Sequence, residues 1–143
     1  MRPTKDEVFL NLALELARLS TCRRRRVGCV LTDASHEILA LGYNGVASGQ
    51  PHCLAHPCAG STAPSGASLD ACLAIHAEEN ALIRCRDFKA IHTAYCSTAP
   101  CIGCTKKLLN TGCLRVVFRE PYPHSEAENL WLRTGREWLH KNY

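Results

Sequence analysis

The sequence predicts an α/β fold, specifically a three-layer α/β/α sandwich around a five-stranded mixed sheet. Three observations support this: a helical hydrophobic stripe opens the chain, a short hairpin follows, and strands then alternate with helices. Strands joined through helices lie parallel, whereas a hairpin adds an antiparallel pair, so the sheet should be parallel in its second half. The chain has 143 residues, enough for one hydrophobic core, and we expect residues 1–143 to form a single domain.

The first half of the chain should contain one helix and one hairpin. Residues 4–19 carry apolar side chains at helical spacing, and Thr4 with Glu7 three residues later has the pattern of a capping box. The stripe expected in the core consists of Phe9, Leu12, Ala13, Leu16 and Leu19. Strands are expected at 27–31 and 38–42, joined by a polar turn.

The second half should alternate helices and strands. Helical spacing predicts helices at 72–86, 101–110 and 125–134. The last two end near Gly112 and Gly135, as helices often do. The expected strands are 93–97, 115–118 and 137–140.

Residues 44–70 form a long insertion rich in glycine and proline. A loop of this length in a compact domain needs a functional reason or an additional cross-link. We therefore expect a role for it, and a metal that ties it down is one solution.

The composition is that of a globular protein, with 46% apolar and 21% charged residues. No apolar stretch approaches the roughly 20 residues needed to cross a membrane, and no secretion signal is evident, so a cytoplasmic protein is expected. Ten cysteines therefore point to metal ligation more than to disulfides. Four of them lie in apolar segments and should be buried thiols: Cys29, Cys85, Cys96 and Cys113.

The net charge of +4 includes four consecutive arginines, Arg23–Arg26. Such a run is typical of a solvated loop. A basic chain suits a phosphorylated substrate and also suits nucleic acid.

The residues with the clearest chemistry are His76-Ala77-Glu78 and Pro100-Cys101-Ile102-Gly103-Cys104. One histidine and two cysteines supply three zinc ligands and leave the fourth position for water, as in catalytic zinc sites. Glu78 is two residues from the histidine, where its carboxylate can move protons between that water, N3 of cytosine and the leaving amine. This His-x-Glu…Pro-Cys-x-x-Cys pattern is the known signature of zinc-dependent nucleobase deaminases.

From about residue 4 to residue 135 the chain resembles the deoxycytidylate (dCMP) deaminases of the cytidine deaminase superfamily. Three blocks carry the resemblance: Val27–Val30 followed by Gly42-Tyr43-Asn44-Gly45, His76–Leu82, and Thr98–Cys104. It implies a cytidine-deaminase-like fold and the hydrolysis of dCMP to dUMP and ammonia, which supplies a precursor of dTMP. The Gly-Tyr-Asn-Gly segment favours this family over tRNA adenosine deaminases and guanine deaminases.

The resemblance also implies substrate contacts. Asn44 matches an asparagine that contacts the substrate, although a left-handed residue in a glycine-flanked turn is an alternative interpretation. Ala77 would approach the base through its backbone, and Tyr122 would line the nucleotide pocket. Candidate partners of the phosphate are Arg26, Arg84 and Arg86.

The chain departs from the family at two places. Glu79 replaces a common apolar residue, and Thr98-Ala99 replaces a bulky residue before Pro100-Cys101. Both changes bear on the shape of the base pocket and leave the metal ligands intact.

A second, structural zinc is also implied by the resemblance. A closed site needs four ligands, and our choice is Cys22, Cys53, Cys58 and Cys72, with His52 and His56 as alternatives to Cys22. Free thiols in a flexible loop are the competing interpretation.

The resemblance further implies a homo-oligomer, often a hexamer, and regulation by dCTP and dTTP near Gly42, Tyr43 and Gly45. Two alternatives remain open. One is a deaminase of cytidine or another nucleoside, of guanine or of tRNA adenosine. The other is a zinc-stabilised nucleic-acid-binding module, although nucleic acid and membrane are not the partners that we expect.

Overall fold

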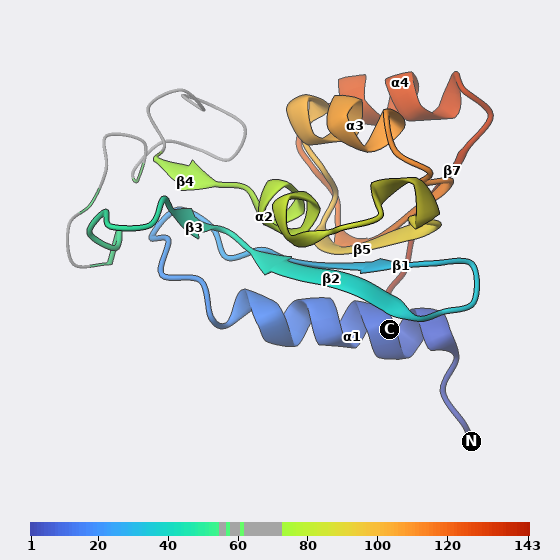
Figure 1. Cartoon of the computed structure of the whole chain (residues 1–143), viewed down its shortest axis with the longest axis horizontal. Coiled ribbons are helices and arrows are strands. Elements are labelled where there is room, and N and C mark those ends of the chain that lie inside the picture. The colour runs from blue at the N-terminus through green and yellow to red at the C-terminus, as the bar shows by residue number, and fades with distance from the viewer. Residues whose placement is uncertain (55–56, 58–60, 62–72) are drawn as a thin grey trace.

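A computed structural model describes residues 1–54, 57, 61 and 73–143 and has three layers (Figure 1). Its elements are α1 (Lys5–Ala17), β1 (Gly28–Thr32), β2 (Ile38–Tyr43), β3 (Gly45–Val46), β4 (Ala74–Ile75), α2 (Ala77–Arg84), a 3-10 helix (Phe88–Ala90), β5 (Thr93–Thr98), α3 (Ile102–Leu109), β6 (Arg115–Glu120), α4 (Glu126–Leu132) and β7 (Glu137–His140). Figure 1 shows α1 on one face of the sheet and α2, α3 and α4 on the other. The predicted α/β/α sandwich is confirmed.

The main sheet has five strands in the order β2-β1-β5-β6-β7. Strand β1 pairs antiparallel with β2 and β5, whereas β5, β6 and β7 are mutually parallel. The mixed sheet with a parallel second half is thus as predicted. Within the described residues, no helix combines the length and apolarity that crossing a bilayer requires.

Helix α1 begins where the sequence predicts, because the Thr4 side chain accepts a hydrogen bond from the Glu7 backbone at 3.1 Å. The helix lies against β1 at Gly28, where a Cβ atom would stand only 2.0 Å from the Ala13 carbonyl oxygen. Leu19 was predicted in the core, and this is wrong: the helix ends at residue 17, and Leu19 is 58% exposed.

A polar network joins α1 to the sheet. Arg115 donates to both Asp6 carboxylate oxygens, at 2.8 and 3.2 Å, and the Tyr95 hydroxyl donates to one of them at 2.7 Å. Burial raises the pKa of Asp6, but the hydrogen bonds from Arg115 and Tyr95 outweigh it and hold the pKa below its ordinary value.

The start of α2 differs from the prediction of a helix over 72–86. Residue 72 lies outside the described part of the chain, and Ala74–Ile75 form strand β4, which pairs with β3. His76 is the extended N-cap, so the helix begins at Ala77. The long-range pairing with β3 overrides the local helical pattern.

Helix α2 packs on β2 at Gly42. A Cβ atom at this position would lie 2.4 Å from the Ala77 carbonyl oxygen and 2.5 Å from the Ala81 nitrogen. The glycine therefore allows the backbone that carries His76 and Glu78 to lie directly on the sheet. The four cysteines predicted to be buried thiols, Cys29, Cys85, Cys96 and Cys113, are buried on this side of the sheet.

Candidate active site

The N-terminal ends of α2 and α3 bring three metal-ligand atoms together. The Cys101 and Cys104 sulfurs each lie 3.3 Å from His76 Nδ1, and all three atoms lie within 4.8 Å of one another. Zinc bound tetrahedrally by sulfur and nitrogen would hold these atoms about 3.5 Å apart. The donor set and its spacing fit zinc, and it is the one such group among the described residues.

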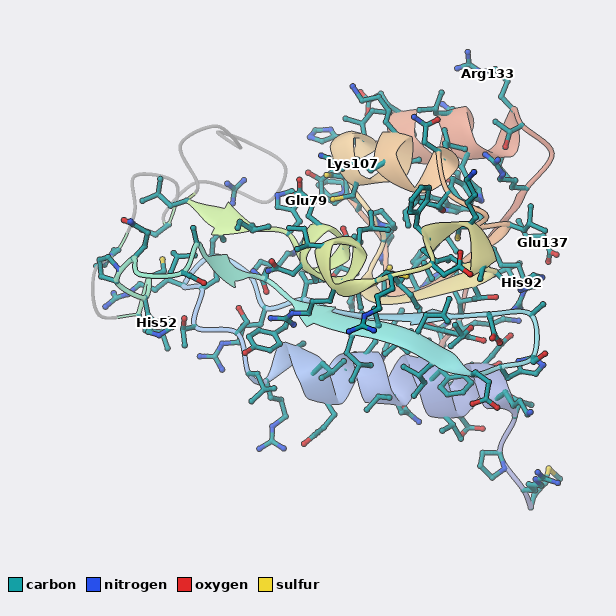
Figure 2. All side chains as sticks on the ribbon, viewed as in Figure 1. His52, Glu79, His92, Lys107, Arg133 and Glu137 are labelled. Carbon is teal, nitrogen blue, oxygen red and sulfur yellow. The ribbon has the colours of Figure 1, made fainter. Side chains whose placement is uncertain are left out.

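Local hydrogen bonds explain why these side chains converge. Cys101 is the N-cap of α3, and its sulfur accepts from the Cys104 backbone at 3.5 Å. The His76 backbone donates to the Glu79 carboxylate at 3.1 Å, which fixes the first turn of α2. Glu79 also forms an ion pair with Lys107 of α3 at 2.9 Å, and Figure 2 shows the two side chains facing each other. One glutamate thus joins the two helices that supply the ligands.

The two thiols differ in acidity. The hydrogen bond from Cys104, helped by His76, lowers the pKa of the Cys101 thiol to about 4 despite its burial. The same hydrogen bond and burial raise the pKa of Cys104. A divalent cation at this site would displace the remaining proton, because zinc binds cysteine as the thiolate.

Glu78 is a buried carboxyl group beside the metal ligands, with 4% of its surface exposed. Burial raises its pKa to about 7, although a hydrogen bond with Cys104 and the charge of His76 oppose the shift. A carboxyl group whose pKa lies near neutrality can both accept and donate a proton, as general acid–base catalysis requires.

These groups open into a pocket with about 570 Å³ of empty space, counting its open mouth. Its lining residues are Cys22, Arg24, Arg25, Val27, Asn44, Ala74, His76, Ala77, Glu78, Thr98, Ala99, Cys101 and Tyr122. The predicted Asn44, Ala77 and Tyr122 thus lie together with the metal ligands. The unusual Thr98 and Ala99 also line the pocket, whereas Glu79 does not.

Asn44 is 7% exposed and connects two segments at the pocket. Its side-chain oxygen accepts from the Val27 backbone at 2.8 Å, and its side-chain nitrogen donates to the Arg25 carbonyl at 2.7 Å. It does not have the left-handed backbone considered above, because His36 is the one described non-glycine residue with positive φ. The side chain holds the start of β1 against the pocket.

The arginine run is divided between two environments. Arg24 and Arg25 are half-buried and line the pocket, whereas Arg23 and Arg26 are exposed. The Arg25 guanidinium lies 5.9 Å from the centre of the Tyr122 ring. The Tyr122 hydroxyl is buried and has no hydrogen-bond partner among the described residues. The solvated loop expected for the run is therefore wrong for the two arginines that line the pocket. The sequence did offer one indication for Arg24 and Arg25: they come just before the first strand of the predicted hairpin.

Other candidates lie away from this pocket. Arg86 is exposed beyond the C-terminal end of α2, while His76 lies at its N-terminal end. Arg84 donates to the Leu41 carbonyl, and Arg26 borders a second pocket described below. Of the three residues considered for regulation, Gly42 packs under α2, the Tyr43 carbonyl accepts from Asn80, and Gly45 pairs with Ile75.

Two of the predicted structural-zinc ligands lie in neighbouring segments. Cys22 and Cys53 are both buried, and the Leu54 backbone donates to the Thr21 carbonyl at 3.0 Å. His52 contacts the Thr21 hydroxyl at 2.8 Å. Cys58, Cys72 and His56 lie outside the described residues.

Comparison with known proteins points to one family. Residues 3–120 match the family described as "Cytidine and deoxycytidylate deaminase zinc-binding region". The deoxycytidylate deaminase of Schizosaccharomyces pombe is 38% identical over 125 residues, which cover 85% of this chain and 38% of that protein. This chain thus spans less than half the length of that relative. The deoxycytidylate deaminase of Mycobacterium phage D29 is 36% identical over 123 residues, covering 82% of this chain and 95% of the phage protein.

A solved structure shows the same fold. The dCMP deaminase of cyanophage S-TIM5, crystallised with dCMP and dUMP, superposes with a TM-score of 0.75 at 24% identity. The match covers 99% of each chain. At this level of identity the likeness concerns the fold, including the layer order that brings α2 and α3 together.

Proposed function

The chain belongs to the cytidine and deoxycytidylate deaminase zinc-binding family, and on that premise we propose that it hydrolyses dCMP to dUMP and ammonia. The observation that carries the proposal is the buried Glu78 carboxyl beside the cluster of His76, Cys101 and Cys104, in a pocket bordered by arginines. The product would serve as a precursor of dTMP in pyrimidine deoxynucleotide metabolism.

His76, Cys101 and Cys104 would hold the metal in this reaction. Zinc, when bound, supplies a Lewis acid that makes a water molecule nucleophilic near neutral pH. The Glu78 carboxylate accepts a proton from that water and delivers it to N3 of the base. The water oxygen adds at C4 as a hydroxyl group. Glu78, having given its first proton to N3, would take the remaining proton of this hydroxyl and pass it to the amino group, which leaves as ammonia while the C4 carbonyl forms. Burial of Glu78 keeps bulk water away from these transfers.

Two arginines at the pocket favour a nucleotide, which has a phosphate group, over a nucleoside, which has none. Arg24 and Arg25 border the pocket, and guanidinium groups are well suited to bind phosphate oxygens. We assign the 5′-phosphate to these two residues. Asn44 and the Ala77 backbone are assigned to the base and sugar, and Tyr122 supports Arg25 at the mouth.

The direct test measures ammonia release from dCMP, CMP, deoxycytidine, cytidine and guanine, with zinc determined on the same sample. We expect strong preference for dCMP. Preference for deoxycytidine or cytidine would contradict the assignment of the arginines, and activity on guanine would overturn the substrate class. Bound zinc without ammonia release from any substrate would favour the nucleic-acid-binding alternative.

We propose a second, structural zinc held by Cys22, Cys53, Cys58 and Cys72. Support comes from the burial of Cys22 and Cys53 in segments joined by a backbone hydrogen bond. The test compares zinc content before and after Cys53→Ser. We expect a fall from about two ions per chain to about one, with the catalytic ion retained. One ion in both proteins would contradict the second site.

We also propose a homo-oligomer, specifically a hexamer, in which dCTP activates and dTTP inhibits near Gly42, Tyr43 and Gly45. Sedimentation and dCMP saturation curves with each triphosphate test these points, and unchanged curves would count against regulation. A cytoplasmic location is proposed because none of the eight described cysteines forms a disulfide, which suits a reducing compartment.

A further inference from the structure

A second pocket adjoins the catalytic one. It has about 750 Å³ of empty space, much of it open to solvent, and its lining residues are Cys22, Arg23, Arg24, Arg25, Arg26 and Leu54. Cys22, Arg24 and Arg25 line both pockets, so the two are contiguous. Among the described residues that line the second pocket, none is acidic. Its surface is therefore strongly basic.

The basic segment is anchored at both ends, by the Arg23 side chain at one end and by its backbone at the other. Arg23 Nε donates to the Cys53 and Leu54 carbonyls at 3.0 and 3.1 Å. At the other end, Asn44 bonds to the Arg25 carbonyl and the Val27 nitrogen. A run of like charges that served only for solvation would not need these fixed contacts. The hydrogen bonds keep the arginines around one cavity.

The arginines are arranged so that they could bind two successive phosphates of one nucleotide. Arg24 and Arg25 border the space next to the metal ligands, whereas Arg23 and Arg26 border only the outer pocket. If the inner pair binds the phosphate attached to the sugar, a further phosphate on the same nucleotide extends toward the outer pair. A pyrophosphate carries more negative charge than one phosphate and is suited to several guanidinium groups.

We propose that the outer pocket binds the second phosphate of a cytosine nucleotide, so that the chain also deaminates deoxycytidine 5′-diphosphate (dCDP). This inference rests on the proposed function. The reaction is the same hydrolysis: water supplies the new C4 oxygen, the amino group leaves as ammonia, and the phosphates are unchanged. No additional reactant is needed.

The test measures kcat/KM for dCMP and dCDP in the full-length zinc-bound protein, in the wild type and in Arg26→Gln. Arg18→Gln is the matched control, because Arg18 is exposed, pairs with Glu15 and lines neither pocket. We expect the wild type to use dCDP at least as efficiently as dCMP. In Arg26→Gln the ratio of the dCDP value to the dCMP value should fall about tenfold, since one charge-assisted contact is lost. Arg18→Gln should leave the ratio unchanged.

Three results would overturn the inference. If dCMP is deaminated and dCDP is not, the outer pocket does not serve the substrate, while the proposed function stands. If dCDP inhibits dCMP turnover without competing with it, the nucleotide occupies a separate site. If single-stranded oligodeoxynucleotides are deaminated and Arg26→Gln weakens that activity, the pocket binds a nucleic-acid backbone instead. Failure with dCMP itself would mean that the proposed function is wrong.

Discussion

Each face of the sheet has a carboxyl group removed from water, partly for Asp6 and almost fully for Glu78, and the two groups have opposite properties. On the α1 face, Asp6 accepts hydrogen bonds from Arg115 and Tyr95, and its pKa lies below the ordinary value. On the α2 face, Glu78 is almost fully buried, and its pKa rises to about 7. One carboxylate is stabilised by cationic and hydroxyl donors, whereas the other is not.

The difference in pKa distinguishes a carboxyl group that stabilises the fold from one that can take part in catalysis. A partly buried carboxylate with strong donors stays ionised and links elements, as Asp6 links α1 to β5 and β6. A carboxyl group that is held away from water and has no cationic side chain bonded to it has a pKa nearer neutrality, so it can both take up and release a proton. The depth of burial of a carboxyl group and the side chains bonded to it together distinguish the functional residue from the structural one.

The largest effect should come from Glu78→Gln. The amide keeps the shape of the side chain but cannot accept and return a proton, so kcat should fall by about 10³-fold or more. Zinc content and unfolding temperature should remain near the wild-type values, because glutamine removes the cost of burying a charge. Stopped assays of ammonia release and metal analysis check both points. Glu37→Gln, at an exposed glutamate, is the control, and retained turnover in Glu78→Gln would exclude the proton-transfer role.

Gly28 and Gly42 each allow a helix to pack closely on the sheet, so substitutions at these two positions can be compared directly. Gly28→Ala and Gly42→Ala would each place a Cβ atom against fixed backbone atoms, so each should lower the free energy of unfolding by about 1–3 kcal/mol. Only Gly42→Ala displaces α2, which carries Glu78 and follows His76. We expect that variant to bind zinc more weakly and turn over more slowly, while Gly28→Ala retains activity once folded. Equal losses of activity in both variants would contradict the separation of the two faces.

Asp6→Asn should affect stability and leave the chemistry intact. The variant loses the charged partner of Arg115, and because both side chains are about one-fifth exposed, the expected loss is about 1–2 kcal/mol. Urea unfolding measures this loss, and kcat for dCMP should not change. A large fall in kcat would show that the α1 face is coupled to the active site.

The smallest effect is the pH dependence of that loss. Because the folded-state pKa of Asp6 lies below the ordinary 3.8, its contribution to stability is full above about pH 5 and disappears as the pH falls through the folded-state value. The difference in unfolding free energy between wild type and Asp6→Asn should therefore shrink between about pH 5 and pH 2. Unfolding curves at several pH values test the sign, and a difference that grows toward low pH would contradict the assignment.

Much of this arrangement was predictable from sequence because the signals are local. Cys101 and Cys104 lie within one helical turn, and Thr4 caps its helix through a residue three positions away. The start of α2 was not predictable in this way, since it depends on β4 pairing with a distant strand. The position of Arg25 at the pocket was missed for the same reason, because the distant Asn44 holds its backbone carbonyl.

The glycines at positions 28 and 42 also affect how a mutational survey of this chain would be interpreted. They lie on adjacent strands, one residue apart in register, and each is covered by a helix on its own side of the sheet. A saturation screen scored by growth would rank both positions as intolerant, beside the metal ligands, although neither lines the catalytic pocket. Scoring protein abundance in the same library would distinguish them: the glycine variants should be depleted from the folded pool, whereas Glu78 variants should accumulate as intact, inactive protein.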